Sequence, residues 1–304
     1  MNIAAMHRTP LNPTARKSIS ISILALAVVG LFCGASPAGA TPILGSDLAS
    51  FAVLGASGVT NVPVSTIGGN LGSAPNASVG GGYIFTSGSL QPNTLLAQNA
   101  QIQLDAAILA VNAAGPGSTI PAGDLDAFQA AHGGTIAPGT YTVPAAGVNL
   151  MGALFLDGGG SSTAVWKFLF PTTLITSTTS TVTVQNVGTG AGVGLYWSVG
   201  TAASLNGPTF AGNVLAQDIS SSDGNLTITC GRLLSSEKQV TLIQDHISIG
   251  CAGVGFGSGG FDQGAAVGSG GTGGSAGRVV PEPGSLALLA LGLAGLGWVR
   301  RRKG

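Results

Sequence analysis

The feature that most constrains the fold is a series of short β-prone runs from Gly139 onward. Each run is rich in Thr, Val, Leu and Phe, and Gly, Asn or Asp separates it from the next. The runs are Tyr141–Val143, Ala153–Leu156, Ala164–Phe168, Thr181–Val184, Gly194–Ser198, Phe210–Ala216, Leu226–Ile228 and Val240–Ile243. Short strands at intervals of ~8–12 residues are typical of a sandwich, a barrel or a solenoid.

A degenerate repeat within this series favours the solenoid. The segments 207–213 and 227–233 share a pattern of glycine and apolar residues and lie ~19 positions apart. A period of this length suits one coil of a β-solenoid, in which each coil stacks only on its neighbours. Because the repeat is degenerate, this pattern alone leaves a sandwich open.

Residues 95–114 depart from the strand pattern, because they are rich in Ala, Leu and Gln and contain neither Gly nor Pro. Apolar residues recur at a spacing of seven and predict an amphipathic helix of about five turns, with this face turned to the core. The face consists of Leu95, Leu96, Ile102, Ala106 and Leu109. Residues 115–117, Gly-Pro-Gly, end the helix. A second, short helix is expected at 124–131, with Asp124 as its cap.

The N-terminus carries the parts of a secretory signal. Arg16 and Lys17 precede the apolar run 19–32, and the small residues 38–40 match a signal peptidase site. We therefore expect cleavage before Thr41. The apolar run has about 14 residues, fewer than the ~20 that span a bilayer, which favours a cleaved signal over an N-terminal anchor.

The C-terminus has a motif, an apolar stretch (286–299) and a basic cluster (300–303), a stop-transfer pattern. The motif consists of Val280, Pro281, Glu282 and Pro283. At ~1.5 Å per residue the apolar stretch covers about 21 Å of a ~30 Å hydrocarbon core, so we expect a transient membrane anchor. A lasting single anchor is the alternative.

This tail resembles the PEP-CTERM sorting tail, which an exosortase removes in that family. The resemblance implies an exported protein at the surface of a Gram-negative bacterium that makes exopolysaccharide, or outside it. The precursor would lie transiently in the inner membrane.

Without its two ends the chain is acidic. Between Thr41 and Val280 it has four basic and ten acidic residues, a net charge of −6. Such a chain lacks the basic surface that nucleic-acid binding requires. Charged residues are also scarce, at 7% of the precursor against ~25% in ordinary domains, which argues against a charged helical bundle.

Two cysteines, Cys230 and Cys251, remain once Cys33 leaves with the signal. In an oxidising compartment they are a candidate disulfide that closes a loop of about 20 residues and contributes ~3 kcal/mol. Two buried thiols are the alternative. The sequence has no second cysteine pair or histidine cluster beside them, so we expect no zinc site.

Read in order, residues 43–251 resemble the bacterial and fungal ice-binding protein family. The segments that carry the resemblance are LASFAVLG (48–55), IGGNLG (67–72), IAPGTY (136–141), LFLDGG (154–159), AVWKF (164–168), YWSVG (196–200) and FAGNVLA (210–216). The resemblance implies a mainly β fold, a right-handed discontinuous β-solenoid (β-helix) with one long α-helix packed alongside. The expected organisation is a signal peptide (1–40), the solenoid domain (41–252), a Gly-rich linker (253–279) and the sorting tail (280–304).

The activity that the resemblance implies is binding to an ice crystal surface. This requires a flat, rigid face of hydroxyl and methyl groups, and threonine on a strand supplies both in fixed rotamers. The richest stretch is 172–183, where alternate residues of a strand would share one face. The predicted binding residues are Thr173, Thr176, Thr178, Ser180, Thr181 and Thr183. An ordinary exposed solenoid surface is the alternative, and Pro208 and Asp223 make the later coils less regular than is usual in the family.

Catalysis finds little basis in the sequence. Polysaccharide lyases and hydrolases need paired carboxylates or a suitable base. Asp124 and Asp126 belong to a helix start, His132 to a helix end, and no nucleophile motif accompanies His246 beside Asp245. We therefore expect no enzyme activity and no cofactor.

The rival function is that of a structural or adhesive matrix protein that binds exopolysaccharide or cells. Aromatic side chains would stack on sugars if they were exposed. The strand positions of Trp166, Tyr196 and Trp197 instead predict that these side chains belong to the core.

Overall fold

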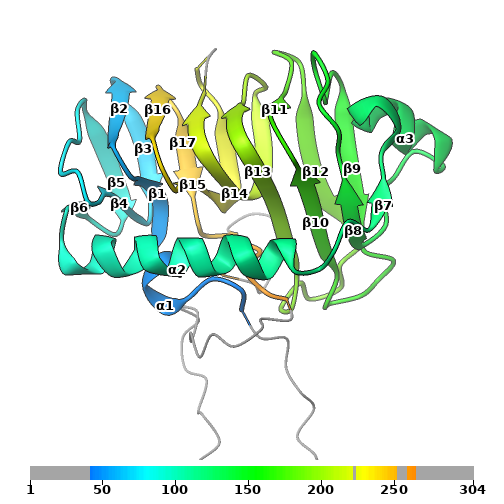
Figure 1. The fold of residues 1–304 in the computed structure, drawn as a ribbon, viewed down its shortest axis with the longest axis horizontal. Helices are drawn as coiled ribbons and strands as arrows, with labels where there is room; N and C mark the ends of the chain where they lie inside the picture. Colours follow the sequence, from blue (N-terminus) through cyan, green and yellow to red (C-terminus); the bar gives the residue numbers. More distant parts are fainter. Residues whose placement is uncertain (1–41, 222–223, 252–258, 265–304) are drawn as a thin grey trace, which may run out of the picture. The chain divides into compact units, whose positions relative to one another are not determined.

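The computed structural model describes residues 42–221, 224–251 and 259–264, which form a mainly β domain (Figure 1). The signal peptide and the sorting tail, including the apolar stretch 286–299, lie outside the described residues. Within the described residues, no helix is both long and apolar enough to cross a membrane. The helical elements are α1 (Ser46–Ala49), α2 (Leu95–Asn112), η2 (Pro121–Gly123) and α3 (Leu125–Ala131).

Every run that the sequence predicts from residue 139 onward forms a strand, and β13, β14 and β15 extend well beyond the ends of their predicted runs. They are β1 (Phe51–Gly55), β2 (Gly58–Val62), β3 (Ser65–Gly68), β4 (Asn70–Ser73), β5 (Tyr83–Ser87), β6 (Leu90–Pro92), β7 (Ser118–Thr119), β8 (Gly139–Thr142), β9 (Ala153–Asp157), β10 (Val165–Phe170), β11 (Leu174–Ile175), β12 (Thr181–Gln185), β13 (Gly194–Ser204), β14 (Thr209–Ser220), β15 (Thr227–Ser235), β16 (Gln239–Ile243) and β17 (His246–Ser248).

These strands pair in parallel and stack in three series, which we name faces A, B and C. Face A runs β6, β4, β1, β15, β14, β13, β10, β8 and β7. Face B runs β2, β16, the ends of β14 and β13, and β11. Face C runs β5, β3, β17, the starts of β15 and β14, β12 and β9. The expected mainly β fold of parallel strands is confirmed.

Single strands turn the corners between faces. In β14, residues 209–210 belong to face C, 213–216 to face A and 218–220 to face B. Gly212 forms the first corner with φ +90°, a conformation that favours glycine. It pairs with Gly231 of the next coil. The repeat of ~19 residues therefore corresponds to stacked coils.

The stacking order differs from the chain order (Figure 1). The first coil, β1–β3, pairs with β4 and β5 on one side and with β15–β17 on the other. Helix α2 follows β6 and runs along the stack, and the chain then continues with β7 and β8 at the far end. The last coil returns to the first, so the two ends of the domain meet inside the stack.

The interior between the faces contains stacked aromatic rings. The ring centroids of Phe168 and Trp197 lie 4.5 Å apart at 12°, and those of Tyr141 and Phe168 lie 5.4 Å apart at 21°. The indole N–H groups of Trp166 and Trp197 donate to the carbonyls of Ile136 and Ala211, at 3.1 and 2.9 Å. Both tryptophans and Tyr196 are fully buried, as the sequence predicts.

Helix α2 is present where the sequence predicts it, but of the five residues predicted for its buried face only Leu96 packs against the domain. Leu95, Ile102 and Leu109 are 71%, 69% and 71% exposed. The opposite side of the helix is buried against α1 and face A. It consists of Ala97, Ala100, Leu104, Ala107 and Val111. The reason is steric, because face A already presents large side chains such as Phe51 and Leu215, and small alanines allow the helix to approach them closely.

The shorter helix α3 and its cap agree with the sequence. The Asp124 carboxylate accepts a hydrogen bond from the Ala127 N–H at 2.9 Å. His132 is the C-terminal cap residue, and its Nδ1 lies 2.7 Å from the Phe128 carbonyl oxygen.

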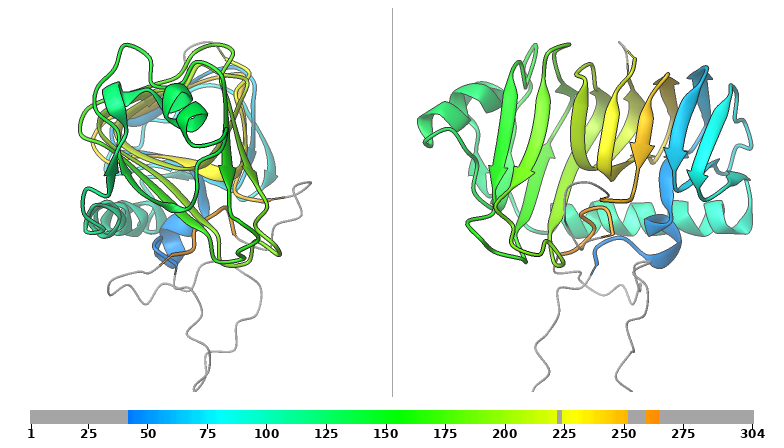
Figure 2. Two further views of the ribbon diagram at one scale, coloured as in Figure 1. Left: turned by 90° about the vertical axis from the view of Figure 1, so that its right-hand side faces the viewer. Right: turned by 180° about the vertical axis from the view of Figure 1, so that it is seen from behind.

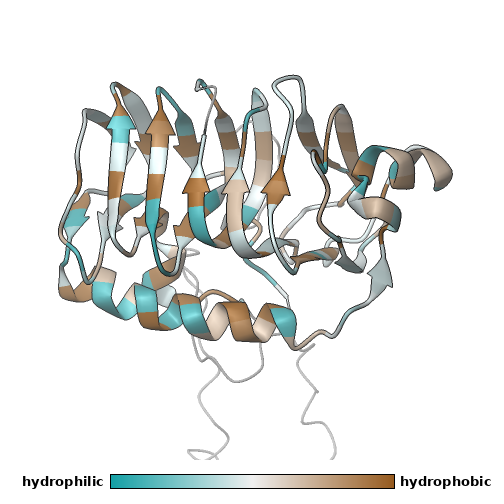
Figure 3. Ribbon diagram, turned by 45° about the horizontal axis from the view of Figure 1, so that its top comes forward, coloured by the Kyte–Doolittle hydropathy of each residue, from teal (hydrophilic) through white to brown (hydrophobic). Residues whose placement is uncertain are grey.

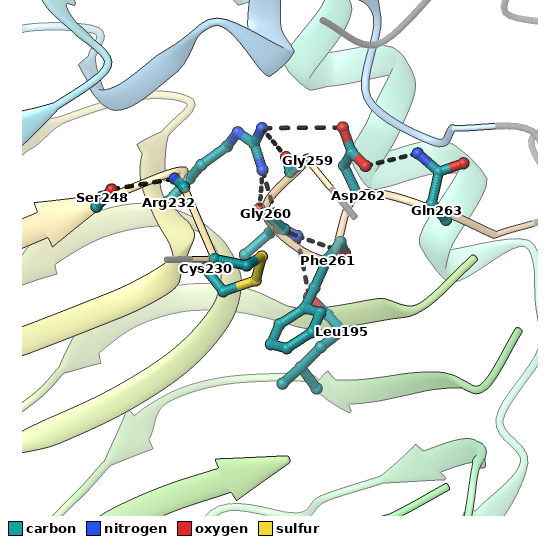
Figure 4. Close-up of a disulfide and its surroundings, with 12 residues drawn as sticks. Leu195, Cys230, Arg232, Ser248, Gly259, Gly260, Phe261, Asp262 and Gln263 are labelled. Carbon is teal, nitrogen blue, oxygen red and sulfur yellow. Dashed lines mark hydrogen bonds and ion pairs between the residues drawn. A yellow bond between two sulfur atoms is a disulfide. The ribbon is translucent and has the colours of Figure 1, made fainter. Parts of the chain in front are cut away.

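The segment 259–264 packs into the domain, although the sequence places it in the Gly-rich linker. Phe261 and Asp262 are each 1% exposed. A disulfide joins Cys230 of β15 to Cys251, with the Cα atoms 4.4 Å apart, near this segment (Figure 4). This is the pairing that the sequence favours. The compact domain therefore extends beyond residue 252.

Arg232 holds this segment in place (Figure 4). Its buried guanidinium donates to the carbonyls of Gly259 and Gly260 at 2.7 and 3.0 Å, and to that of Ala49 at 2.7 Å. One guanidinium nitrogen lies 3.9 Å from the Asp262 carboxylate. Burial lowers the pKa of Arg232, and the negative charge of Asp262 opposes that shift.

Candidate functional site

Faces B and C carry the surface that is open to a large ligand, because α1 and α2 pack on face A. Figure 2 shows the stack from its end and from behind, with α2 along one side only. Apolar and polar residues alternate along the strands (Figure 3), as expected where one side of a strand faces the interior and the other faces solvent. The binding surface is therefore to be sought among the outward residues of faces B and C.

Face B presents a column of hydroxyl groups across four neighbouring strands. Thr60 pairs with Thr241, Thr241 with Ser220, and Ser220 with Ser204. The Thr60 and Thr241 hydroxyls are hydrogen-bonded at 3.2 Å, and those of Ser204 and Ser220 at 3.3 Å. Parallel strands place such groups at intervals of ~4.8 Å. The strand pairs within this face have no register shift, so the hydroxyl groups follow one another regularly from strand to strand.

Small and neutral side chains surround most of this column. On one side lie Ala202 of β13 and Thr173, which directly precedes β11. On the other side, Val62 and Ile243 pair across β2 and β16. Among the residues that pair within the five strands of this face, Asp218 is the one that carries a charge. Face B thus combines hydroxyl groups with methyl groups and little charge.

Face C is richer in threonine but is hollowed. Thr181 pairs with Thr209 and Thr209 with Thr227, and the column continues to His246 and Thr66. The pairing of β12 with β14 ends after its first residue pair, which leaves a groove of about 220 Å³. The groove is lined by Val182, Thr183, Val184, Thr209, Phe210, Ala211, Thr227, Thr229 and Phe261. Face C therefore lacks the continuous strand pairing of face B.

The structure separates the residues that the sequence places on one face. The stretch 172–183 forms two strands, β11 on face B and β12 on face C, with a turn between them. Thr173 lies on face B, whereas Thr181 and Thr183 lie on face C and the exposed Thr178 lies in the turn. The prediction of one continuous strand is wrong.

Two of the predicted residues, Thr176 and Ser180, are each 1% exposed. The Thr176 hydroxyl oxygen accepts from the Asn206 N–H at 2.9 Å. The Ser180 hydroxyl donates to the Ser177 carbonyl at 2.8 Å. Both hydroxyls therefore stabilise the turn, and neither is available to a surface ligand.

The hydroxyl column of face B was missed because each strand contributes a single hydroxyl. A signal for it exists within each strand, because Val59 and Val240 point inward and the following Thr60 and Thr241 must then point outward. These hydroxyls align only through the register between neighbouring coils. The degenerate repeat in the sequence does not fix that register.

The carboxylate of Asp245, beside His246, has structural partners. The Asp245 carboxylate accepts from the backbone N–H groups of Leu226 and Ile243, each at 3.0 Å, and bonds to the Ser221 hydroxyl. Burial raises the pKa of Asp245, and these hydrogen bonds oppose that shift. Asp245 is buried whereas His246 is exposed on face C. Among the described residues, no cluster of three or more His, Cys, Asp or Glu side chains could hold a metal ion.

Comparison with known proteins identifies the family of this chain and its C-terminal motif. Residues 53–248 match the family described as Ice-binding-like, and residues 279–303 match the PEP-CTERM protein-sorting motif, which implies export and surface sorting in Gram-negative bacteria. A protein of Nostoc sp. (strain HG1) named ice-binding protein is 30% identical over 290 residues, which cover 92% of this chain and 94% of that protein.

Solved structures of ice-binding proteins are also similar to this chain. The ice-binding protein of the Antarctic ascomycete Antarctomyces psychrotrophicus is 27% identical with a TM-score of 0.55, over 66% of this chain and 95% of that one. An ice-binding protein from an Antarctic biological consortium is 26% identical with a TM-score of 0.56, over 70% and 93%. The chain belongs to the ice-binding-like family.

Proposed function

We propose that the exported protein binds ice through face B without catalysing a reaction, on a right-handed discontinuous β-solenoid with α2 alongside. The observation that carries the proposal is the hydroxyl column of Thr60, Thr241, Ser220 and Ser204 on an unbroken parallel sheet. Hydroxyls fixed at regular intervals can hold ordered water, and the neighbouring methyl groups compete little for it. Thr173 of the predicted set belongs to this face.

A bulky substitution on face B tests the proposal. Thr241→Tyr places a large ring in the middle of the column, and we expect ice shaping and inhibition of ice recrystallisation to be lost. The matched control is Thr183→Tyr, an exposed threonine on face C, which should retain both activities. Thermal melting of both variants should stay close to that of the parent, because surface substitutions usually change stability by less than ~0.5 kcal/mol.

The opposite result identifies the alternatives. Loss of activity in Thr183→Tyr alone would assign ice binding to face C. If the parent neither shapes ice nor inhibits recrystallisation but is retained on exopolysaccharide, the protein is an adhesive matrix protein instead.

We infer that maturation removes both ends of the precursor. Signal peptidase would cleave before Thr41, and an exosortase would cleave at the Val280–Pro283 motif after a transient stay of 286–299 in the inner membrane. Mass spectrometry of the protein recovered from the producing cells should find Thr41 as the first residue and no peptide from 286–299. An intact tail in the recovered protein would indicate a lasting anchor.

A further inference from the structure

Helix α2 carries an apolar stripe on the side that faces away from the domain. The stripe consists of Leu95, Ile102 and Leu109, the three most exposed large apolar side chains among the described residues. They are seven positions apart, so they lie above one another along two-turn intervals of the helix. A helix that packs on a sheet through one side normally presents polar residues on the other. The stripe therefore requires a partner or remains in contact with water at a free-energy cost.

The chemistry of the helix excludes two classes of partner. Asp105 is the only charged residue among the 18 residues of α2, and no lysine or arginine is present. Helices that lie on anionic lipid carry basic residues along the polar side, and nucleic-acid contacts need them as well. An uncharged apolar stripe with heptad spacing instead fits another helix of the same kind.

We propose that two copies of this protein associate through antiparallel contact of their α2 helices, with Ile102 on the twofold axis. In this register Ile102 meets its own copy, and Leu95 of one chain meets Leu109 of the other. Because a twofold axis makes the contact self-complementary, one stripe supplies both halves of the interface.

The polar residues beside the stripe favour the antiparallel arrangement. The twofold axis places Asp105 of one chain opposite the amide of Gln98 in the other, a donor that satisfies the carboxylate. In a parallel arrangement Asp105 would lie beside Ala106 of the other chain, which offers no donor from its side chain. Antiparallel helices also bring macrodipole ends of opposite sign together.

The size of the contact predicts a weak dimer. An 18-residue helix is about 27 Å long and ~10–12 Å wide, so each chain contributes roughly 300 Å². Stable complexes bury ~800 Å² per partner, so association through α2 alone is expected to be transient in dilute solution. The contact leaves face B of both chains uncovered and does not depend on ice binding.

Cysteine cross-linking of the full-length chain in intact producing cells tests the proposal. Ile102→Cys should form a covalent dimer on mild oxidation, because the two sulfur atoms meet on the axis. Leu95→Cys should not link to itself, because its two copies lie about 21 Å apart along the helices. Leu95→Cys co-expressed with a differently tagged Leu109→Cys should link between the two tags. All three positions are largely exposed, so the variants should fold.

The control is Thr183→Cys, an exposed position on face C, together with the wild-type chain. We expect Ile102→Cys to link at least about tenfold faster than Thr183→Cys, since a held pair has an effective concentration in the mM range. Equal rates would overturn the proposal. Efficient self-linking of Leu95→Cys would overturn the antiparallel register. Shielding of Ile102→Cys from a membrane-impermeant thiol reagent, without cross-linking, would assign the stripe to a lipid surface and also overturn it.

Discussion

At the scale of single residues, Arg232 shows how one buried charge fastens distant parts of the chain. It bonds to the end of α1 through Ala49, to Asn213 of β14 and to the carbonyls of 259–260. Asn213 also donates to the Gly260 and Phe261 carbonyls at 3.1 and 2.9 Å. These bonds satisfy carbonyl oxygens that water cannot reach, and they explain why 259–264 is part of the domain.

Replacing this residue should be severely destabilising. Arg232→Met removes the ion-pair partner of Asp262 and the guanidinium donor of the Ala49 and Gly259 carbonyls, and removal of one member of a buried ion pair typically costs about 3–5 kcal/mol. Urea denaturation measures the change in the free energy of unfolding. Lys238→Met, at an exposed position, is the control and should change it by less than ~0.5 kcal/mol. Equal effects in the two variants would mean that the Arg232 bonds are unimportant.

Asp157 gives the domain a defined response to acid. Its carboxylate accepts from the Gly159 N–H at 2.8 Å and from the Asn186 and Gln185 amides at 2.9 and 3.2 Å. These bonds hold the pKa of Asp157 below its ordinary value. A depressed pKa in the folded state adds stability above the unfolded-state pKa, and this contribution is lost as the pH falls through the folded-state pKa.

We therefore expect Asp157→Asn to reduce the dependence of the melting temperature on pH. The comparison covers the range from about pH 2 to about pH 6, where carboxylates titrate. The parent should lose stability more steeply toward the acid end than the variant. Parallel curves for the two proteins would show that the three hydrogen bonds do not couple to protonation.

At the scale of elements, the buried side of α2 depends on small residues. Ala100 is fully buried against the large side chains of face A, whereas Ala106 on the same helix is exposed. Ala100→Leu should destabilise the domain by about 1–3 kcal/mol, because it inserts methyl groups into a packed contact. Ala106→Leu should be close to neutral. Thermal or urea denaturation of both variants checks the assignment, and a reversed order would restore the face that the sequence predicts.

The same helix shows what the sequence can and cannot predict. The absence of Gly and Pro in 95–114 predicts the helix, because helix formation is local. Its buried side depends on a sheet surface that the helix sequence does not describe.

The split of 172–183 between two faces could not be predicted for a related reason. The turn is held by a hydrogen bond of the Thr176 hydroxyl to the distant Asn206 N–H and by a local bond of Ser180 to Ser177, and alternation within a strand carries no information about either.

At the scale of the whole molecule, the family fold and the strand runs were predictable because the order of the motifs along residues 43–251 is specific. The binding face was not. Thr60 and Thr241 are 181 positions apart in the sequence, and the hydrogen bond between their hydroxyls exists only once the last coil meets the first. Long-range register of this kind is fixed by packing and not by local propensity.

The position of the first coil also sets the timing of folding during export. In the proposed export, with the N-terminus first, β1 and β2 would leave the secretion channel before their partners β15 and β16, which lie about 180 residues later in the chain. Until those strands arrive, one edge of the first coil has no neighbour and the stack cannot close. On the proposed export route, the domain would therefore complete its fold only after nearly all of it had crossed the membrane. Before export, the same long separation between partner strands would slow folding inside the cell. The chain would then stay unfolded, and a secretion channel passes unfolded chains.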